Sequence, residues 1–173
     1  MIRKFDSENF KWDGVDTLVY KQDGSPFKDV TRQVLYDGAY DIPCQFRYFE
    51  CLPGGYSTLE YHEHTHMVMI GRGKGQLLLG DEIYDVAQGD FIEIPGNTIH
   101  QFRANKGDYI GFFCLVNKDR DKVKLLTDEQ METLRQKPKI KDFLDEEYVP
   151  EIELPNGKKE KLNTRQHDTN VCF

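Results

Sequence analysis

Residues 54–66 read GGYSTLEYHEHTH and are the most informative stretch of the chain, because they hold three of its five histidines within five residues. Side chains alternate along a strand, so Glu60 and His62 project from the same face, about 7 Å apart. On a straight strand His66 would lie about 13 Å beyond His62, too far to share an ion whose bonds are about 2 Å long. The chain must therefore turn between His62 and His66, which brings the next strand alongside.

A second segment, residues 89–100, reads GDFIEIPGNTIH and ends in a histidine directly after a turn rich in glycine and proline. We predict that one divalent transition metal ion is bound by Glu60, His62, His66 and His100. Three imidazoles and one carboxylate suit Mn, Fe, Ni, Co or Zn. An octahedral ion with these four ligands keeps two positions for water or substrate, as a Lewis-acid catalyst requires, whereas tetrahedral zinc would be closed.

The sequence around both segments predicts an antiparallel all-β domain over residues 31–116. Short apolar or alternating runs are separated there by Gly, Pro, Asp and Asn, and many short strands at this spacing suggest a closed barrel. Residues 1–30 are polar and predict a peripheral arm with a turn at 21–26. The predicted strands are 33–36, 45–52, 57–62, 66–71, 75–79, 82–86, 90–94, 100–104 and 108–116.

The last part of the chain, residues 117–173, changes to a helical pattern and then to a polar tail. Thr127 and Gln130 form a capping-box sequence, which predicts a short helix that ends at Pro138. A second helical turn is predicted over residues 140–144. The sequence does not decide whether this helical segment covers the mouth of the barrel.

The charge balance narrows the classes of possible binding partner. The chain has 23 Lys and Arg residues and 30 Asp and Glu residues, which gives a net charge of −7. This charge disfavours nucleic acid and anionic membranes and favours a small-molecule substrate. No apolar run approaches the ~20 residues that span a bilayer, and the first residues lack the apolar core of a signal peptide, so we expect a cytoplasmic protein. The four cysteines lack any C-x-x-C pairing and are expected to be reduced, packed thiols, none of them a nucleophile.

The two segments resemble the paired motifs of the cupin superfamily. The first motif is a glycine, five residues, His-x-His, three or four residues, Glu, six residues and a glycine, and this frame fits residues 54–73. The second is a glycine, five residues, a proline, one residue, a glycine, two residues and a histidine, and it fits residues 89–100. Glu60 stands where the first histidine is usual and His66 where the glutamate is usual, so the ligand set is permuted. Asn97 replaces a glycine, and asparagine is the side chain that best accepts a left-handed backbone.

The resemblance implies a cupin barrel, that is, a double-stranded β-helix or jelly roll, with a short C-terminal helical segment. The pattern Glu-x-His-x-x-x-His is similar to the metal site of ureidoglycine aminohydrolase-type cupins, manganese enzymes that release ammonia from a small ureido acid. In that type a glutamine stands at the position of His100, so the substrate does not transfer. The chain also resembles small single-domain cupins of undefined activity, which carry an Arg-Tyr-Phe-Glu strand like residues 47–50.

Our first hypothesis is a metal-dependent enzyme that acts on a small metabolite bearing a carboxylate or a hydroxy-carbonyl pair. The chemistry would be non-redox, such as amine release, lyase action or isomerisation. Glu60 is the candidate catalytic base. The candidate substrate-binding residues are His64, Phe102, Arg47 and Tyr48; strand parity turns either Arg47 or Tyr48 inward but does not say which.

Two other functions fit the same sequence. A metal-dependent dioxygenase can use the same ligands, and an anaerobic assay separates it from the first hypothesis. A non-catalytic cupin that binds a small ligand is the third hypothesis, weakened because the arm of residues 1–30 is too short for a helix-turn-helix unit. An exposed barrel edge near this arm would be covered by a second copy, so we predict a homodimer.

Overall fold

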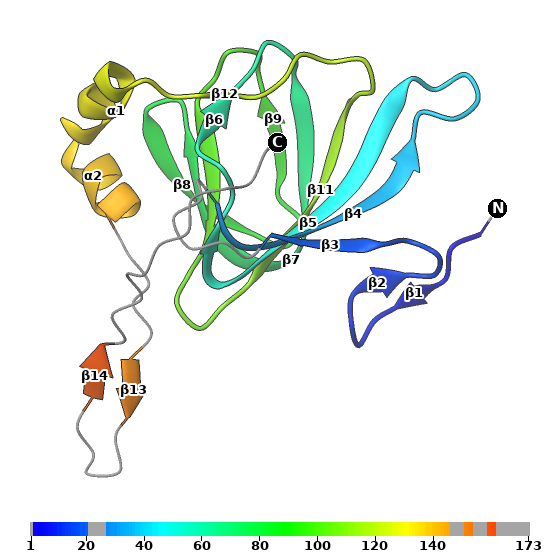
Figure 1. The fold of residues 1–173 in the computed structure, drawn as a ribbon, viewed down its shortest axis with the longest axis horizontal. Coiled ribbons are helices and arrows are strands. Elements are labelled where there is room, and N and C mark those ends of the chain that lie inside the picture. The colour runs from blue at the N-terminus through cyan, green and yellow to red at the C-terminus, as the bar shows by residue number, and fades with distance from the viewer. Residues whose placement is uncertain (1, 21–26, 146–150, 154–158, 162–173) are drawn as a thin grey trace.

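The computed structural model describes residues 2–20, 27–145, 151–153 and 159–161 of the 173-residue chain. Figure 1 shows a barrel of strands with α1 and α2 lying beside it. The elements are β1 (Phe5–Asp6), β2 (Lys11–Trp12), β3 (Thr17–Tyr20), β4 (Lys28–Asp37), β5 (Cys44–Tyr56), β6 (Glu60–Tyr61), β7 (His66–Leu79), β8 (Glu82–Ala87), β9 (Phe91–Ile94), β10 (His100–Ala104), β11 (Ile110–Asn117), β12 (Lys124–Leu125), α1 (Asp128–Arg135), α2 (Pro138–Asp145), β13 (Glu151–Glu153) and β14 (Lys159–Lys161).

Ten of the described strands form one sheet in the order β12-β6-β10-β7-β11-β5-β4-β3, with β8 and β9 paired to β7. Strand β10 pairs with β7 along its whole length and also meets β5, where Arg103 lies opposite Tyr56. This double pairing joins distant parts of the sheet into a closed barrel. The predicted all-β barrel with a short C-terminal helical segment is therefore confirmed.

The hydrophobic core lies inside the barrel, where alternate side chains of each strand meet. On β11 every second side chain from Ile110 to Val116 is buried. Phe112 lies between two other rings, with its centroid 4.2 Å from that of Phe102 and 5.6 Å from that of Phe49. These aromatic contacts fill part of the barrel interior and show which face of β11 points into it.

Strand β7 is continuous, whereas the sequence predicted two strands at 66–71 and 75–79. Its register against β11 shifts by one residue, because the paired positions pass from Arg72 to Ile70 and skip Gly71. A Cβ at Gly71 would lie 2.7 Å from the ring of Phe113. Gly71 therefore forms a β-bulge within one long strand, rather than the end of a shorter one.

The predicted strand at 57–62 is also different, since β5 runs on to Tyr56 and only Glu60–Tyr61 remains as β6. Ser57 donates its backbone N–H to the carbonyl of Phe102 and accepts the N–H of Phe102 with its hydroxyl, both at 2.9 Å. A side-chain acceptor thus replaces a backbone partner at this point and interrupts the ladder.

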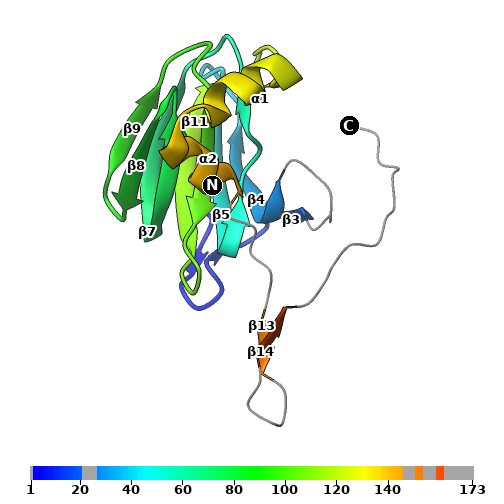
Figure 2. The same cartoon turned by 90° about the vertical axis from the view of Figure 1, so that its left-hand side faces the viewer.

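Both helices pack on the outside of the barrel, which settles the question that the sequence left open (Figure 2). Thr127 caps α1 with the predicted capping box to Gln130. Leu134 of α1 and Phe143 of α2 pack in one cluster with Leu78, whose neighbours in β7 point into the barrel core. No helix in the described ranges is long and apolar enough to cross a membrane.

The N-terminal residues lie against the sheet through aromatic side chains. The ring of Phe10 is 4.8 Å and that of Trp12 is 5.5 Å from the ring of Tyr48, and β3 extends the sheet by pairing with β4. The turn predicted at 21–26 lies outside the described residues. The division into an arm of residues 1–30, a barrel of 31–116 and a C-terminal part of 117–173 stays a prediction.

Candidate metal centre

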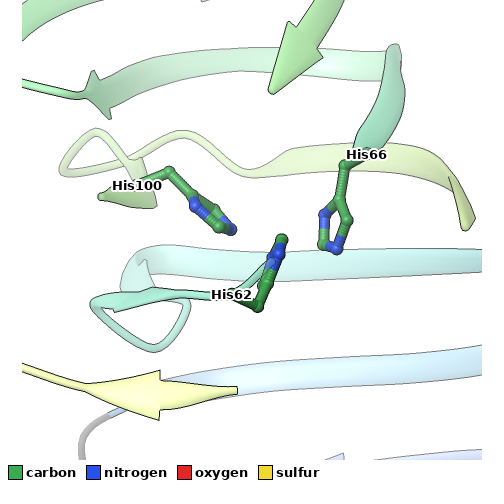
Figure 3. A group of neighbouring side chains, drawn as sticks. All are labelled: His62, His66 and His100. Carbon is green, nitrogen blue, oxygen red and sulfur yellow. The ribbon is translucent and has the colours of Figure 1, made fainter. Parts of the chain in front are cut away.

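Three of the four predicted ligands meet in the barrel interior. His62 follows β6, His66 is the first residue of β7 and His100 is the first residue of β10. Figure 3 shows their imidazoles pointing toward one another from these three segments. One nitrogen from each ring lies within 4.8 Å of the others, and the residues are 0%, 8% and 4% exposed. The predicted turn between His62 and His66 is present and produces this convergence.

The turns of the two sequence motifs hold each other in place. Asn97 donates its backbone N–H to the carbonyl of His62 at 2.6 Å and has a φ of 61°, as the sequence led us to expect. A Cβ at Gly96 would clash with the carbonyl oxygen of Glu63. In the sheet, His100 lies opposite Glu60. The close approach at Gly96 therefore fixes how His62 and His100 face each other.

The histidine tautomers favour a metal ion between the rings. Nδ1 of His62 lies 2.8 Å from the carbonyl oxygen of His64, and Nδ1 of His100 lies 2.8 Å from that of Thr98. A neutral imidazole that donates from Nδ1 has its lone pair on Nε2, as metal-binding histidines do. Nε2 of His62 is buried and has no hydrogen-bond partner within the described residues. An orphaned acceptor of this kind is costly unless a ligand occupies it.

Burial keeps the imidazoles in the neutral form that binds metal. It lowers the pKa of His100 to about 4, and it is also the largest cause of the lowered pKa values of His62 and His66. Neighbouring histidines lower all three further, because a second positive charge beside the first is unfavourable. The residues thus fit a divalent cation.

Glu60 is close enough to act as a fourth ligand. Its Oε1 lies 3.9 Å from Nε2 of His100, within the range of two donors on one ion. Burial raises the pKa of Glu60 to about 7, and the charge of Arg47 opposes this rise. Without a metal, this carboxyl therefore exchanges protons near neutral pH, as a catalytic acid or base must.

His64 also lies in the site. Its Nε2 is 2.9 Å from Nε2 of His66, and its ring stacks on that of His62 with centroids 3.7 Å apart. Its Nδ1 is 2.6 Å from Oδ1 of Asp121, whose two oxygens also accept the backbone N–H groups of Glu63 and His64. Asp121 fixes the turn that carries the histidines, although no local signal in the sequence pointed to it.

Of the pair Arg47 and Tyr48, the structure turns Arg47 toward the histidines. Its guanidinium donates to Sγ of Cys114 at 3.1 Å. Tyr48 points to the other face of β5, where its hydroxyl donates to Glu50 at 2.6 Å. Phe102 shares the inward face with His100 and stacks in the core, so its predicted contact with substrate stays a prediction.

A buried thiol beside the histidines was missed by the sequence reasoning. Sγ of Cys114 lies 3.6 Å from Nδ1 of His66. Burial raises the pKa of this thiol, whereas the adjacent guanidinium of Arg47 lowers it. Cys114 shares the inward face of β11 with Ile110, Phe112 and Val116, and this alternation along the strand was the available signal. Cys44 and Cys51 are free as well, as expected for reduced cysteines, and Cys172 lies outside the described residues.

The fold and the histidine cluster define a cupin, and comparisons with known proteins place the chain in that family. Residues 47–116 match the cupin domain family, and the chain belongs to it. It is 46% identical over 145 residues to 1-methylthio-D-xylulose 5-phosphate methylsulfurylase of Rhodospirillum rubrum, a match that covers 83% of this chain and 92% of the relative.

Two solved structures agree with the fold. A cupin 2 conserved barrel domain protein from Rhodopseudomonas palustris is 49% identical with a TM-score of 0.78, covering 83% of this chain and 98% of its own. A cupin-2 domain protein from Rhodospirillum rubrum is 44% identical with a TM-score of 0.76, covering 82% and 95%.

Proposed function

We propose that this chain is a metal-dependent enzyme that removes the methylthio group from a methylthio-substituted ketose phosphate. The observation that carries the proposal is the buried thiol of Cys114 against His66 and Arg47 in a cupin site. The 46% identical relative is named for the sulfur chemistry of such a compound, 1-methylthio-D-xylulose 5-phosphate. A thiol in the site can accept the methylthio group.

The ion would be held by His62, His66, His100 and Glu60. When bound, a divalent metal polarises the carbonyl of the ketose and stabilises the negative charge that develops on its oxygen. Manganese, iron, nickel, cobalt and zinc all suit three imidazoles and a carboxylate.

The reaction balances with groups that the site contains. The sulfur of Cys114 attacks the methylthio sulfur, an S–S bond forms, and the bond from that sulfur to carbon breaks with its electron pair going to carbon. Arg47 stabilises the thiolate, and Glu60, while it is not bound to the ion, passes the proton that the thiol loses to the carbon. The thiol is oxidised to a methyl disulfide and the ketose carbon is reduced.

A small thiol must then release the methylthio group from Cys114 by exchange. A reduced thiol is available in the cytoplasm, the location expected from the sequence. The proposal differs from amine release, lyase action and isomerisation in that sulfur and carbon change oxidation state.

The direct test is mass spectrometry of metal-loaded protein incubated with 1-methylthio-D-xylulose 5-phosphate and no added thiol. We expect one methylthio group on the peptide that contains Cys114, released by a small thiol. Cys114→Ser should form no adduct and no product. Cys51→Ser, which alters a fully buried thiol of the core, should react like the wild type. Product formation by Cys114→Ser at the wild-type rate would contradict the proposal.

A metal-dependent dioxygenase remains the second candidate, because His62, His66, His100 and Glu60 suit iron or nickel equally well. The two functions differ in their need for oxygen. Turnover of the methylthio substrate should be equal in air and under argon. A rate that falls to background under argon would favour the dioxygenase.

A further inference from the structure

Two arginines share the inward face of neighbouring strands beside Cys114. Arg47 on β5 lies opposite Val34 of β4 and also opposite Cys114 of β11. Arg32 lies opposite Phe49, two residues further along the same pair of strands. Residues that are directly opposite share a face, so the two arginines are diagonal neighbours on the face that carries the thiol.

A third arginine reaches the same region from the loop after β11. Arg120 donates to the backbone carbonyls of Asn117 at 3.0 Å and Lys118 at 3.3 Å, and to Oε1 of Gln45 at 2.8 Å. Gln45 precedes Arg47 by two residues on β5 and so points to the same face. Arg120 is next to Asp121, so one loop supplies both a support for the histidine turn and a cation to this cluster.

In the part of the chain that the structure describes, no ion pair links a carboxylate to Arg32, Arg47 or Arg120. Arg47 is 8% exposed, and its Nε is buried without a hydrogen-bond partner within the described residues, as is Nε of Arg32. Burial and the charges of Arg47 and Arg32 lower the pKa of Arg120, and Cys114 and Asp37 only partly oppose this shift. Elsewhere in the barrel, by contrast, Arg72 donates two bonds of 2.7 and 2.6 Å to Glu50. A buried guanidinium near two partly buried ones is unfavourable unless an anion compensates their charge.

We propose that Arg32, Arg47 and Arg120 form the subsite for the phosphate group of the substrate. Guanidinium groups match the oxygens of a phosphate with paired N–H donors, and a dianion compensates several of them at once. The inference rests on the proposed function for the identity of the ligand. This subsite also orients the substrate. Because Arg47 contacts the thiol, the phosphate binds on the arginine side of Cys114, and the reacting carbons lie toward the histidines.

The test is calorimetric titration of the full-length protein with inorganic phosphate, against chloride at equal ionic strength. Wild-type protein should bind one phosphate. Arg32→Gln and Arg120→Gln should each weaken binding by about tenfold or more, because each removes a charged donor pair. Arg135→Gln is the matched control, since Arg135 lies on α1 and pairs with Asp145. Circular dichroism verifies folding; should Arg32→Gln fail to fold, Arg120→Gln on its surface loop decides.

Equal phosphate affinity in wild type, Arg32→Gln and Arg120→Gln, or no binding to wild type, overturns the subsite. The proposed function is tested separately with methylthioacetone, a methylthio ketone without phosphate, by the adduct on Cys114. An adduct with unaltered phosphate binding in the arginine variants refutes the subsite alone. Arginine-dependent phosphate binding without any adduct, from this ketone or from the ketose phosphate, supports the subsite and refutes the sulfur chemistry.

Discussion

Replacement of Asp121 by alanine should weaken metal binding without a direct contact to the ion. The carboxylate accepts the backbone N–H of Glu63 at 2.8 Å and of His64 at 3.1 Å, and lies 2.6 Å from Nδ1 of His64. These three contacts fix the turn that places His62 and His66 around one point. Loss of a group that orients metal ligands typically reduces affinity by about 10- to 100-fold, and we expect Asp121→Ala to fall in that range.

The assay is competition between metal-free protein and a chelating dye for Mn²⁺ or Zn²⁺. Asp119→Ala is the matched control, because Asp119 is exposed on the same loop and its loss changes the net charge equally. Asp121→Asn retains one acceptor oxygen and should give an intermediate affinity. If Asp121→Ala bound the metal within about twofold of Asp119→Ala, Asp121 would have no role in positioning the histidines.

Three other predictions concern stability and assembly. In metal-free protein the pKa of Glu60 is raised to about 7 from 4.5, so the folded state holds the proton more tightly, and stability falls as the pH rises from 4.5 to 7. Glu60→Gln removes this effect, so between pH 4.5 and 7 its free energy of unfolding in urea melts should rise by up to about 3 kcal/mol relative to that of the wild type. Parallel pH profiles of the two proteins would contradict this. Phe112→Ala should cost about 3–5 kcal/mol in the same melts, whereas Phe91→Ala, at a position 56% exposed, should cost under about 1 kcal/mol; equal losses would refute the packing argument. Light scattering should give twice the chain mass of 20.2 kDa, and a mass near 20.2 kDa would exclude the homodimer.

Spacing within the two motifs was sufficient to predict much of the site. The separation of His62 and His66 required a turn, and residues 89–100 supplied the third imidazole. The left-handed backbone of Asn97 and the cap at Thr127 were likewise predictable, because each depends on local chemistry of a few neighbouring residues.

Features that depend on distant parts of the chain were not predictable in the same way. Gly71 belongs to a bulge because β11 lies beside it, and glycine alone signals a bulge and a turn equally. Side-chain alternation shows that Arg47 and Tyr48 point to opposite faces of their strand. Which of these faces the barrel encloses depends on strands that are distant in the sequence. Asp121 contacts His64 from a loop more than 50 residues away, which only the closed barrel brings near.

The metal content of protein purified without chelator shows whether the three buried histidines hold an ion. We expect about one equivalent of a divalent transition metal in the wild type, and its loss in His62→Ala, which removes the buried Nε2 that has no hydrogen-bond partner within the described residues. Less than about a tenth of an equivalent in the wild type, or equal metal in His62→Ala, would contradict a metal centre at His62, His66 and His100.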